Sequence, residues 1–238
     1  MKSLKVTIYE HAAALPPLPE GSYFHSRELM ELCENTPRQK PYMAVVSQED
    51  GTVVAHLLAI TYYRRSWLPP FLYMNVRVMG NGVYHLTDEE LHEQQLFGMM
   101  AEAITERTHN KALYIEFSHF PQKMFGYKEL RRMGFFHVKW TNIHNSLHSR
   151  TPEERITERQ MKRIELAQER GAVTKPVETE EEFKAFSKLL RHHIWLKPRR
   201  CLPADDFFRV MAQSHRCRLF ITTFHEKVIG CCACVHSD

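Results

Sequence analysis

The 238-residue sequence has no uninterrupted apolar run of about 18 residues, which is the length that a membrane-spanning helix needs. Its first ten residues interrupt each apolar stretch with charge, and no small-residue cleavage site follows them. We therefore expect neither a signal peptide nor a transmembrane helix. These absences favour a protein of the cytoplasm.

Motifs that identify several common enzyme classes are also missing. The chain has nine glycines, and none forms a Walker phosphate loop, a dinucleotide fingerprint or a Gly-x-Ser-x-Gly nucleophile turn. A His-Glu-x-x-His zinc motif is absent as well. The sequence therefore gives no support for a nucleoside triphosphatase, a Rossmann enzyme, a serine hydrolase or a zinc protease.

The charge is nearly balanced, with 32 Lys and Arg against 28 Asp and Glu and a formal net charge of +4. Such a balance permits an anionic substrate. It lacks the clustered basic blocks that favour nucleic-acid binding.

Six cysteines are irregularly spaced, which favours reduced thiols over a disulfide framework. The C-terminal Cys231-Cys-Ala-Cys-Val-His236 places Cys232, Cys234 and His236 on one face of a strand, with the outer two about 13 Å apart. One tetrahedral ion with bonds of about 2.3 Å cannot reach both. We expect small buried thiols and no metal.

The most informative part of the sequence is residues 110–147. Residues 112–117 are short and apolar and predict a buried strand. In residues 127–133, Tyr127, Leu130 and Met133 recur at helical spacing, and Gly134 stands where a left-handed helix cap falls. Residues 135–143 then alternate like a strand packed on one face.

The rest of the chain predicts further strands and helices. A strong turn at residues 49–51 predicts a hairpin, Ser26 predicts a helix cap, and Thr87 with Glu90 resembles a capping box. A highly charged helix is expected over 151–171, and we interpret its arginines as a solvated face. The expected strands are 5–9, 42–46, 52–61, 73–79, 173–177, 218–224 and 228–235, and the other expected helices are 27–34, 87–108, 183–190 and 203–212.

Residues 207–235 repeat the order of residues 24–60, namely a helix, an apolar strand, a tight turn and a second strand. The first copy continues for many residues, whereas the second stops after its hairpin. We therefore predict an α/β protein with a mixed, mostly antiparallel sheet flanked by helices. Its expected divisions are a first lobe at 1–150, a charged connecting helix at 151–172 and a partial second lobe at 173–238.

The segment Tyr127-Lys-Glu-Leu-Arg-Arg-Met-Gly-Phe135 resembles the helix-to-strand junction of the GNAT acyltransferase fold. Two such lobes joined by a charged helix resemble the Fem-type aminoacyl transferases. That resemblance is carried by the order of residues 23–26, 50–55, 134–135, 162–171, 202–208 and 227–230.

The resemblance implies transfer of an aminoacyl group from a charged tRNA to an amine of a peptidoglycan precursor, at the inner membrane face. A related branch resembles acetyltransferases that use acetyl-CoA. Residues 84–90, however, contain three acids and no glycine where a CoA pyrophosphate would bind, which disfavours CoA in the first lobe. We expect no tightly bound cofactor, with aminoacyl-tRNA or acetyl-CoA as donor. The alternative is a non-catalytic or truncated binding module.

No catalytic residue is assigned from the sequence. The residues that we select for an anionic ligand flank the first hairpin, and they are Arg38, Lys40, Tyr63, Arg64 and Arg65, with Tyr62 beside them. Residues 228–235 should be an interior strand that lacks its next neighbour, so we expect further strands from the natural open reading frame or from a partner, or pairing of this edge with another copy of the chain.

Overall fold

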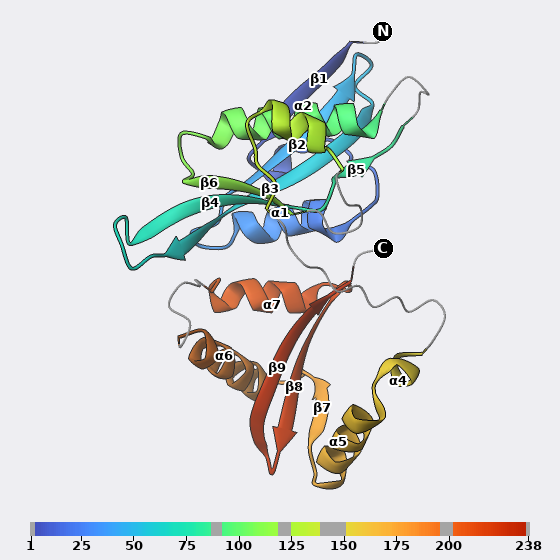
Figure 1. Cartoon of the computed structure of the whole chain (residues 1–238), viewed down its shortest axis with the longest axis vertical. Coiled ribbons are helices and arrows are strands. Elements are labelled where there is room, and N and C mark those ends of the chain that lie inside the picture. The colour runs from blue at the N-terminus through green and yellow to red at the C-terminus, as the bar shows by residue number, and fades with distance from the viewer. Residues whose placement is uncertain (1–2, 87–91, 119–124, 139–150, 196–201, 237–238) are drawn as a thin grey trace. The chain divides into compact units, whose positions relative to one another are not determined.

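A computed structural model describes residues 3–86, 92–118, 125–138, 151–195 and 202–236 (Figure 1). The chain divides into two compact units. Unit 1 contains the described residues within Met1–Phe136, Ile194–Cys217 and Val235–Asp238, and unit 2 contains those within His137–His193 and Arg218–Cys234. No described helix is long and apolar enough to span a bilayer.

Unit 1 is built on a sheet in which, over the described residues, six strands pair in the order β1-β2-β3-β4-β6, with β5 also paired to β3. The neighbours are antiparallel except β4 and β6, which are parallel. The predicted mixed, mostly antiparallel α/β fold is confirmed. The strands are β1 (Leu4–Tyr9), β2 (Pro41–Gln48), β3 (Val53–Arg65), β4 (Leu72–Met79), β5 (Val83–Tyr84) and β6 (Tyr114–Ser118).

Helices and short 3-10 turns accompany this sheet. They are η1 (Ala12–Ala14), η2 (Tyr23–His25), α1 (Arg27–Glu34), α2 (Glu93–Thr108), α3 (Tyr127–Arg132) and α7 (Asp205–Gln213). The Ser26 side chain accepts a hydrogen bond from the Leu29 N–H at 3.1 Å, which confirms the predicted cap of α1. The predicted cap at Thr87 lies outside the described residues.

The main core of unit 1 lies between the sheet and α2. Alternate residues of β2, β3 and β4 point to this side, and Leu96, Phe97, Met100 and Ile104 of α2 recur at three and four residues to meet them. All four of these α2 side chains are buried. The intervening residues of β3, β4 and β6 point to the other side of the sheet, and many of them are polar.

The junction after α3 agrees with the prediction in part. Gly134 has φ 86°, and the Phe135 N–H donates to the Leu130 carbonyl at 3.0 Å, as a left-handed helix end requires. The expected strand at 135–143 is wrong over its described part, because residues 135–138 form no strand and Phe136 is 78% exposed. Residues 139–143 lie outside the described residues. Tyr127, expected on the apolar face, is also exposed.

Unit 2 follows the predicted order with one correction. Its elements are α4 (Pro152–Arg155), α5 (Glu158–Glu169), β7 (Val173–Pro176), α6 (Glu180–Trp195), β8 (Cys217–Phe224) and β9 (Lys227–Val235). The single helix expected at 151–171 is wrong, because Ile156 and Thr157 are extended and Thr157 begins a second helix with its own capping box.

The described part of the second sheet has the order β7-β8-β9, so β9 lies at its edge. This agrees with the unpaired edge that the sequence predicts for residues 228–235. The helix and hairpin of the second copy are present as α7, β8 and β9. Their origin by duplication, and the three-part division of the chain, remain predictions.

Candidate active site

One face of the β3-β4-β6 part of the sheet carries a continuous set of polar and aromatic side chains. We call it the polar face. Strand register places Tyr62 opposite Asn75 and Tyr114 beside Asn75, and it places Arg77 beside Glu116. Paired residues of neighbouring strands share a face, so these rows lie together. The polar face consists of Tyr62, Arg64, Tyr73, Asn75, Arg77, Tyr114, Glu116 and Ser118.

Glu116 is the centre of hydrogen bonding on the polar face. Its Oε2 accepts from the Tyr62 hydroxyl at 3.2 Å, and its Oε1 accepts from the Ser118 hydroxyl at 2.9 Å. The Arg77 Nε lies 3.3 Å from the same Oε1. The carboxylate is therefore held in one orientation by groups from three different strands.

Tyr62 keeps its proton in this environment. Burial is the main cause that raises the pKa of its hydroxyl, and the hydrogen bond with Tyr114 and the negative charge of Glu116 raise it further. The Arg64 guanidinium lies 5.5 Å from the Tyr62 ring centroid and 5.9 Å from that of Tyr114, within cation–π range. Tyr62 is thus a hydrogen-bond donor to Glu116 at neutral pH.

Asn75 occupies the middle of the Tyr62-Asn75-Tyr114 row. Its side chain is fully buried, and neither its amide nitrogen nor its amide oxygen has a hydrogen-bond partner among the described residues. A buried, unpaired amide costs about 1 to 3 kcal/mol of stability. A buried, unpaired amide calls for an explanation, and a bound ligand or an ordered water would supply one.

Two buried histidines lie on the same unit. The Leu58 N–H donates to Nδ1 of His25 at 3.1 Å, and the Gly82 N–H points at Nε2 from 3.1 Å. A neutral imidazole can accept only one of these, and an imidazolium could accept neither. Burial, followed by the nearby charge of His56, lowers the pKa of His25 to about 3. Burial also lowers the pKa of His56 to about 4, although a hydrogen bond with the backbone of His25 raises it in part.

The residues that the sequence predicts for an anionic ligand do not converge. Arg64 joins the polar face, whereas Tyr63 and Arg65 alternate to the opposite face of β3. The Lys40 Nζ lies 2.6 Å from the Glu10 carboxylate, which also pairs with Arg107. Arg38 is exposed in the connection between α1 and β2, with φ 67°. Anion binding by these residues remains a prediction.

Most of the polar face was missed because the sequence interpretation selected only basic residues and tyrosines that flank the first hairpin. Its signal is a polar or aromatic residue at every second position in otherwise apolar strands. That pattern stands at Tyr73, Asn75 and Arg77, and again at Tyr114, Glu116 and Ser118.

The arginine-rich α5 and the C-terminal cysteines remain outside this site. A shallow, solvent-open hollow of about 430 Å³ on α5 is lined by Glu158, Arg159, Lys162, Arg163 and Leu166. Lys162 pairs with Glu158 at 2.7 Å, as on a solvated helix face. The expectation of buried C-terminal thiols is wrong for Cys232 and Cys234, which are exposed because no residue of β9 is buried on either face of the strand. No group of three potential metal ligands occurs among the described residues.

No protein-family model matches the chain, and no curated protein matches it. Among solved structures, it is similar to an aminoglycoside acetyltransferase from an uncultured soil metagenomic sample, with 12% identity, a TM-score of 0.39, and 60% of this chain and 96% of that one covered. A ribosomal-protein-alanine N-acetyltransferase from Brucella melitensis has 10% identity, a TM-score of 0.36, and 60% and 99% coverage.

A third solved structure, an aminoglycoside N-acetyltransferase in complex with CoA, has 9% identity, a TM-score of 0.38, and covers 61% of this chain and 96% of that one. The solved structures similar to this chain thus include N-acetyltransferases. At these TM-scores the likeness carries no functional argument, so function is argued from the polar face itself.

Proposed function

We propose that unit 1 is an N-acyltransferase whose polar face carries out the proton transfers of amide formation. The observation that carries this proposal is the 3.2 Å hydrogen bond from the Tyr62 hydroxyl to Glu116, next to the buried, unpaired amide of Asn75. Acyl transfer to an amine needs a base for the ammonium proton, an acid for the leaving group and a donor to the oxyanion. These three residue types supply each role.

In the proposed reaction the acceptor nitrogen attacks the acyl carbon of a thioester or an ester. The new C–N bond forms, the C–S or C–O bond breaks, and Glu116 takes the ammonium proton. Tyr62 protonates the leaving group and regains a proton from Glu116 along their hydrogen bond. We assign the Asn75 amide N–H as the donor to the acyl oxygen, where negative charge develops, and this role requires the buried side chain to become exposed when the substrate binds. Arg77 and Ser118 position the Glu116 carboxylate.

We propose an amine of a cell-wall precursor as acceptor and aminoacyl-tRNA or acetyl-CoA as donor, in the cytoplasm. The support is the resemblance of residues 127–135 and of the chain's element order to Fem-type and GNAT transferases. A pairing of the β9 edge with another copy of the chain belongs to the same proposal.

The test is a product assay by mass spectrometry. The protein is incubated with acetyl-CoA or with a pool of charged tRNA, together with a uridine-diphosphate-linked muropeptide or small primary amines. Glu116→Gln is expected to lower kcat/KM by about 100-fold or more, the usual effect of losing a general base. Tyr62→Phe should lower kcat with little change in KM. Glu106→Gln, at an exposed position of α2, is the matched control.

A second candidate function is non-catalytic binding. The observation that favours it is that both carboxylate oxygens of Glu116 already have partners, as expected of a structural carboxylate. These partners are Tyr62, Ser118 and Arg77. Muropeptide binding that calorimetry detects in the wild type and in Glu116→Gln alike, without any acylated product, would establish this alternative. Product formation that Glu116→Gln does not affect would contradict the assigned base.

A further inference from the structure

The β3–β4 hairpin extends beyond the rest of its sheet. β2 pairs with β3 only as far as Ile60, and β6 pairs with β4 only from Asn75 onward. Residues 61–65 and 72–74 therefore pair mainly with each other. They form a two-stranded arm, which Figure 1 shows projecting from unit 1. The sequence interpretation ended this strand at residue 61 and did not foresee the arm.

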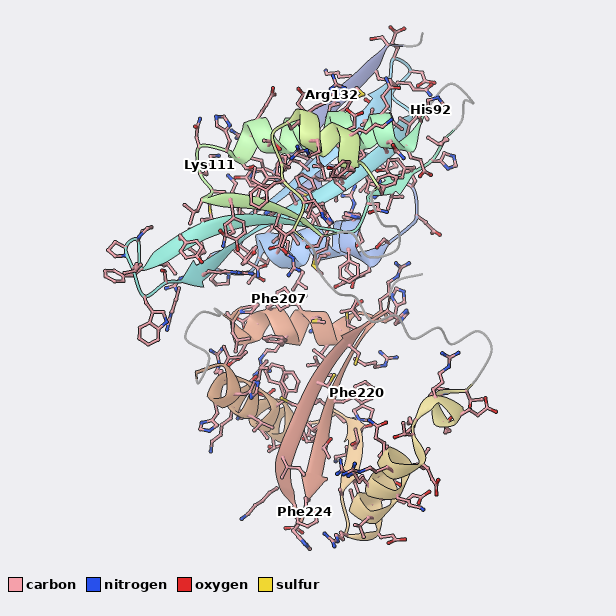
Figure 2. The ribbon with its side chains drawn as sticks, in the orientation of Figure 1. His92, Lys111, Arg132, Phe207, Phe220 and Phe224 are labelled. Carbon is pink, nitrogen blue, oxygen red and sulfur yellow. The ribbon has the colours of Figure 1, made fainter. Side chains whose placement is uncertain are left out.

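The end of the arm is apolar and exposed. Its connecting residues 66–71 read Ser-Trp-Leu-Pro-Pro-Phe. Trp67 is 71% exposed, Leu68 is 74% exposed and Phe71 is 63% exposed, and Leu72 beside them is 45% exposed. Figure 2 shows side chains at this end standing away from the rest of unit 1. Large apolar side chains concentrated on one protrusion are typical of an interaction site.

The arm tip is closed by hydrogen bonds and is not a loose loop. The Ser66 N–H donates to the Phe71 carbonyl at 2.8 Å, and the Leu68 N–H donates to the Ser66 hydroxyl at 3.2 Å. The backbone therefore holds the apolar side chains outward before any partner arrives. Less backbone entropy therefore remains to be lost on binding.

The charge beside the tip is positive. Residues 61–75 contain Arg64 and Arg65 and no acidic residue. Arg65 is exposed, and Arg64 lies over aromatic rings of the polar face. The arm therefore carries apolar Trp and Phe side chains at its end and arginines directly behind them. This order matches a bilayer surface, where apolar and aromatic side chains enter the interface and cationic side chains contact the headgroups.

We propose that the arm tip, residues 66–72, docks unit 1 on an anionic membrane surface. Trp67, Leu68 and Phe71 enter the interfacial region, and Arg65 contacts anionic headgroups. A narrow two-stranded protrusion suits insertion between lipids, whereas a protein partner usually buries a broader patch. This inference is independent of the proposed acyl transfer, since none of the tip residues belongs to the polar face.

The test is sedimentation of the full chain with large unilamellar vesicles. Vesicles that contain phosphatidylglycerol are expected to bind the protein about 10-fold more strongly than pure phosphatidylcholine vesicles. Trp67→Ser combined with Phe71→Ser should lower the partition coefficient about 100-fold or more, because two large apolar side chains no longer leave water. Arg65→Gln should lower binding about 5-fold, and only on anionic vesicles. Phe136→Ser, at an even more exposed phenylalanine, is the matched control and should leave binding unchanged.

Insertion has a spectroscopic readout of its own. Brominated acyl chains should quench wild-type tryptophan fluorescence, and Trp67→Phe should keep vesicle binding while it abolishes most of that quenching. Equal vesicle binding by the wild type and the double serine variant would overturn the proposal. So would loss of binding in Phe136→Ser, binding of free glycerol phosphate without vesicle preference, or a wild-type dimer in light scattering that the double variant disrupts while no vesicles bind.

Discussion

Acidification between pH 7.5 and pH 5 should destabilise unit 1 through its two buried histidines. Their folded pKa values are about 3 for His25 and about 4 for His56, below the ordinary value of 6.5. The unfolded chain therefore binds protons below pH 6.5 while the folded chain does not. By linkage, the stability that these residues contribute is fully present above pH 6.5 and is lost as the pH falls toward 4 and then 3.

Between the folded and the unfolded pKa, the free energy of unfolding falls by 1.36 kcal/mol for each unit by which the pH lies below the unfolded pKa of 6.5. At pH 5 each histidine lowers the free energy of unfolding by about 2 kcal/mol relative to pH 7.5, and the pair by about 4 kcal/mol. That loss is a large fraction of the stability of an ordinary domain, about 5 to 15 kcal/mol. The physical cause at His25 is specific, since an imidazolium would face the Leu58 and Gly82 N–H groups with two donors.

The assay is hydrogen exchange by mass spectrometry on peptides from β2 and β3, corrected for the intrinsic pH dependence of exchange. It reports the opening free energy of unit 1 separately from unit 2. His56→Gln should reduce the loss between pH 7.5 and pH 5 by about 2 kcal/mol, whatever its effect at pH 7.5. His92→Gln, at an exposed position, should not. A wild-type loss below about 1 kcal/mol, or the same loss in wild type and His56→Gln, would refute the reasoning.

Three further predictions concern single positions. Asn75→Leu should raise the free energy of unfolding by about 1 to 3 kcal/mol in urea denaturation, because it removes a buried unpaired amide. The same variant should lose acyl transfer. A destabilised variant would show that the amide has a partner. Gly126→Ala should cost more than 2 kcal/mol in the same experiment, because its new Cβ would lie 2.4 Å from an aromatic ring, whereas Gly134→Ala, with open space and similar φ, should cost only about 1 to 2 kcal/mol. Maleimide should label Cys232 much faster than buried Cys33, because Cys232 is exposed, although its hydrogen bond with Cys234 raises its pKa, whereas burial raises the pKa of Cys33 to about 12. Cys33 should react only after denaturant is added. Equal labelling of both on peptide mapping would contradict the burial.

The sequence alone determined the local structure where one signal acts over a few neighbouring residues. Ser26 begins α1, residues 49–51 turn the first hairpin, and Gly134 ends α3, because each depends on a short-range hydrogen bond or a backbone angle that few residue types satisfy. The mostly antiparallel sheet follows from the order of hairpins. The same local logic failed at Thr157, where a cap inside a charged segment divides what looked like one helix.

Only the tertiary structure decided the site and the arm. Tyr62 and Glu116 are 54 residues apart, and their hydrogen bond depends on the parallel register of β4 and β6, which the sequence pattern does not specify. Lys40 pairs with Glu10, a contact that the sequence did not predict, and anion binding by the basic residues near the first hairpin stays a prediction. Exposure of Trp67 at the arm tip likewise depends on where β2 and β6 stop pairing, a property of the whole sheet and not of the residues in the arm.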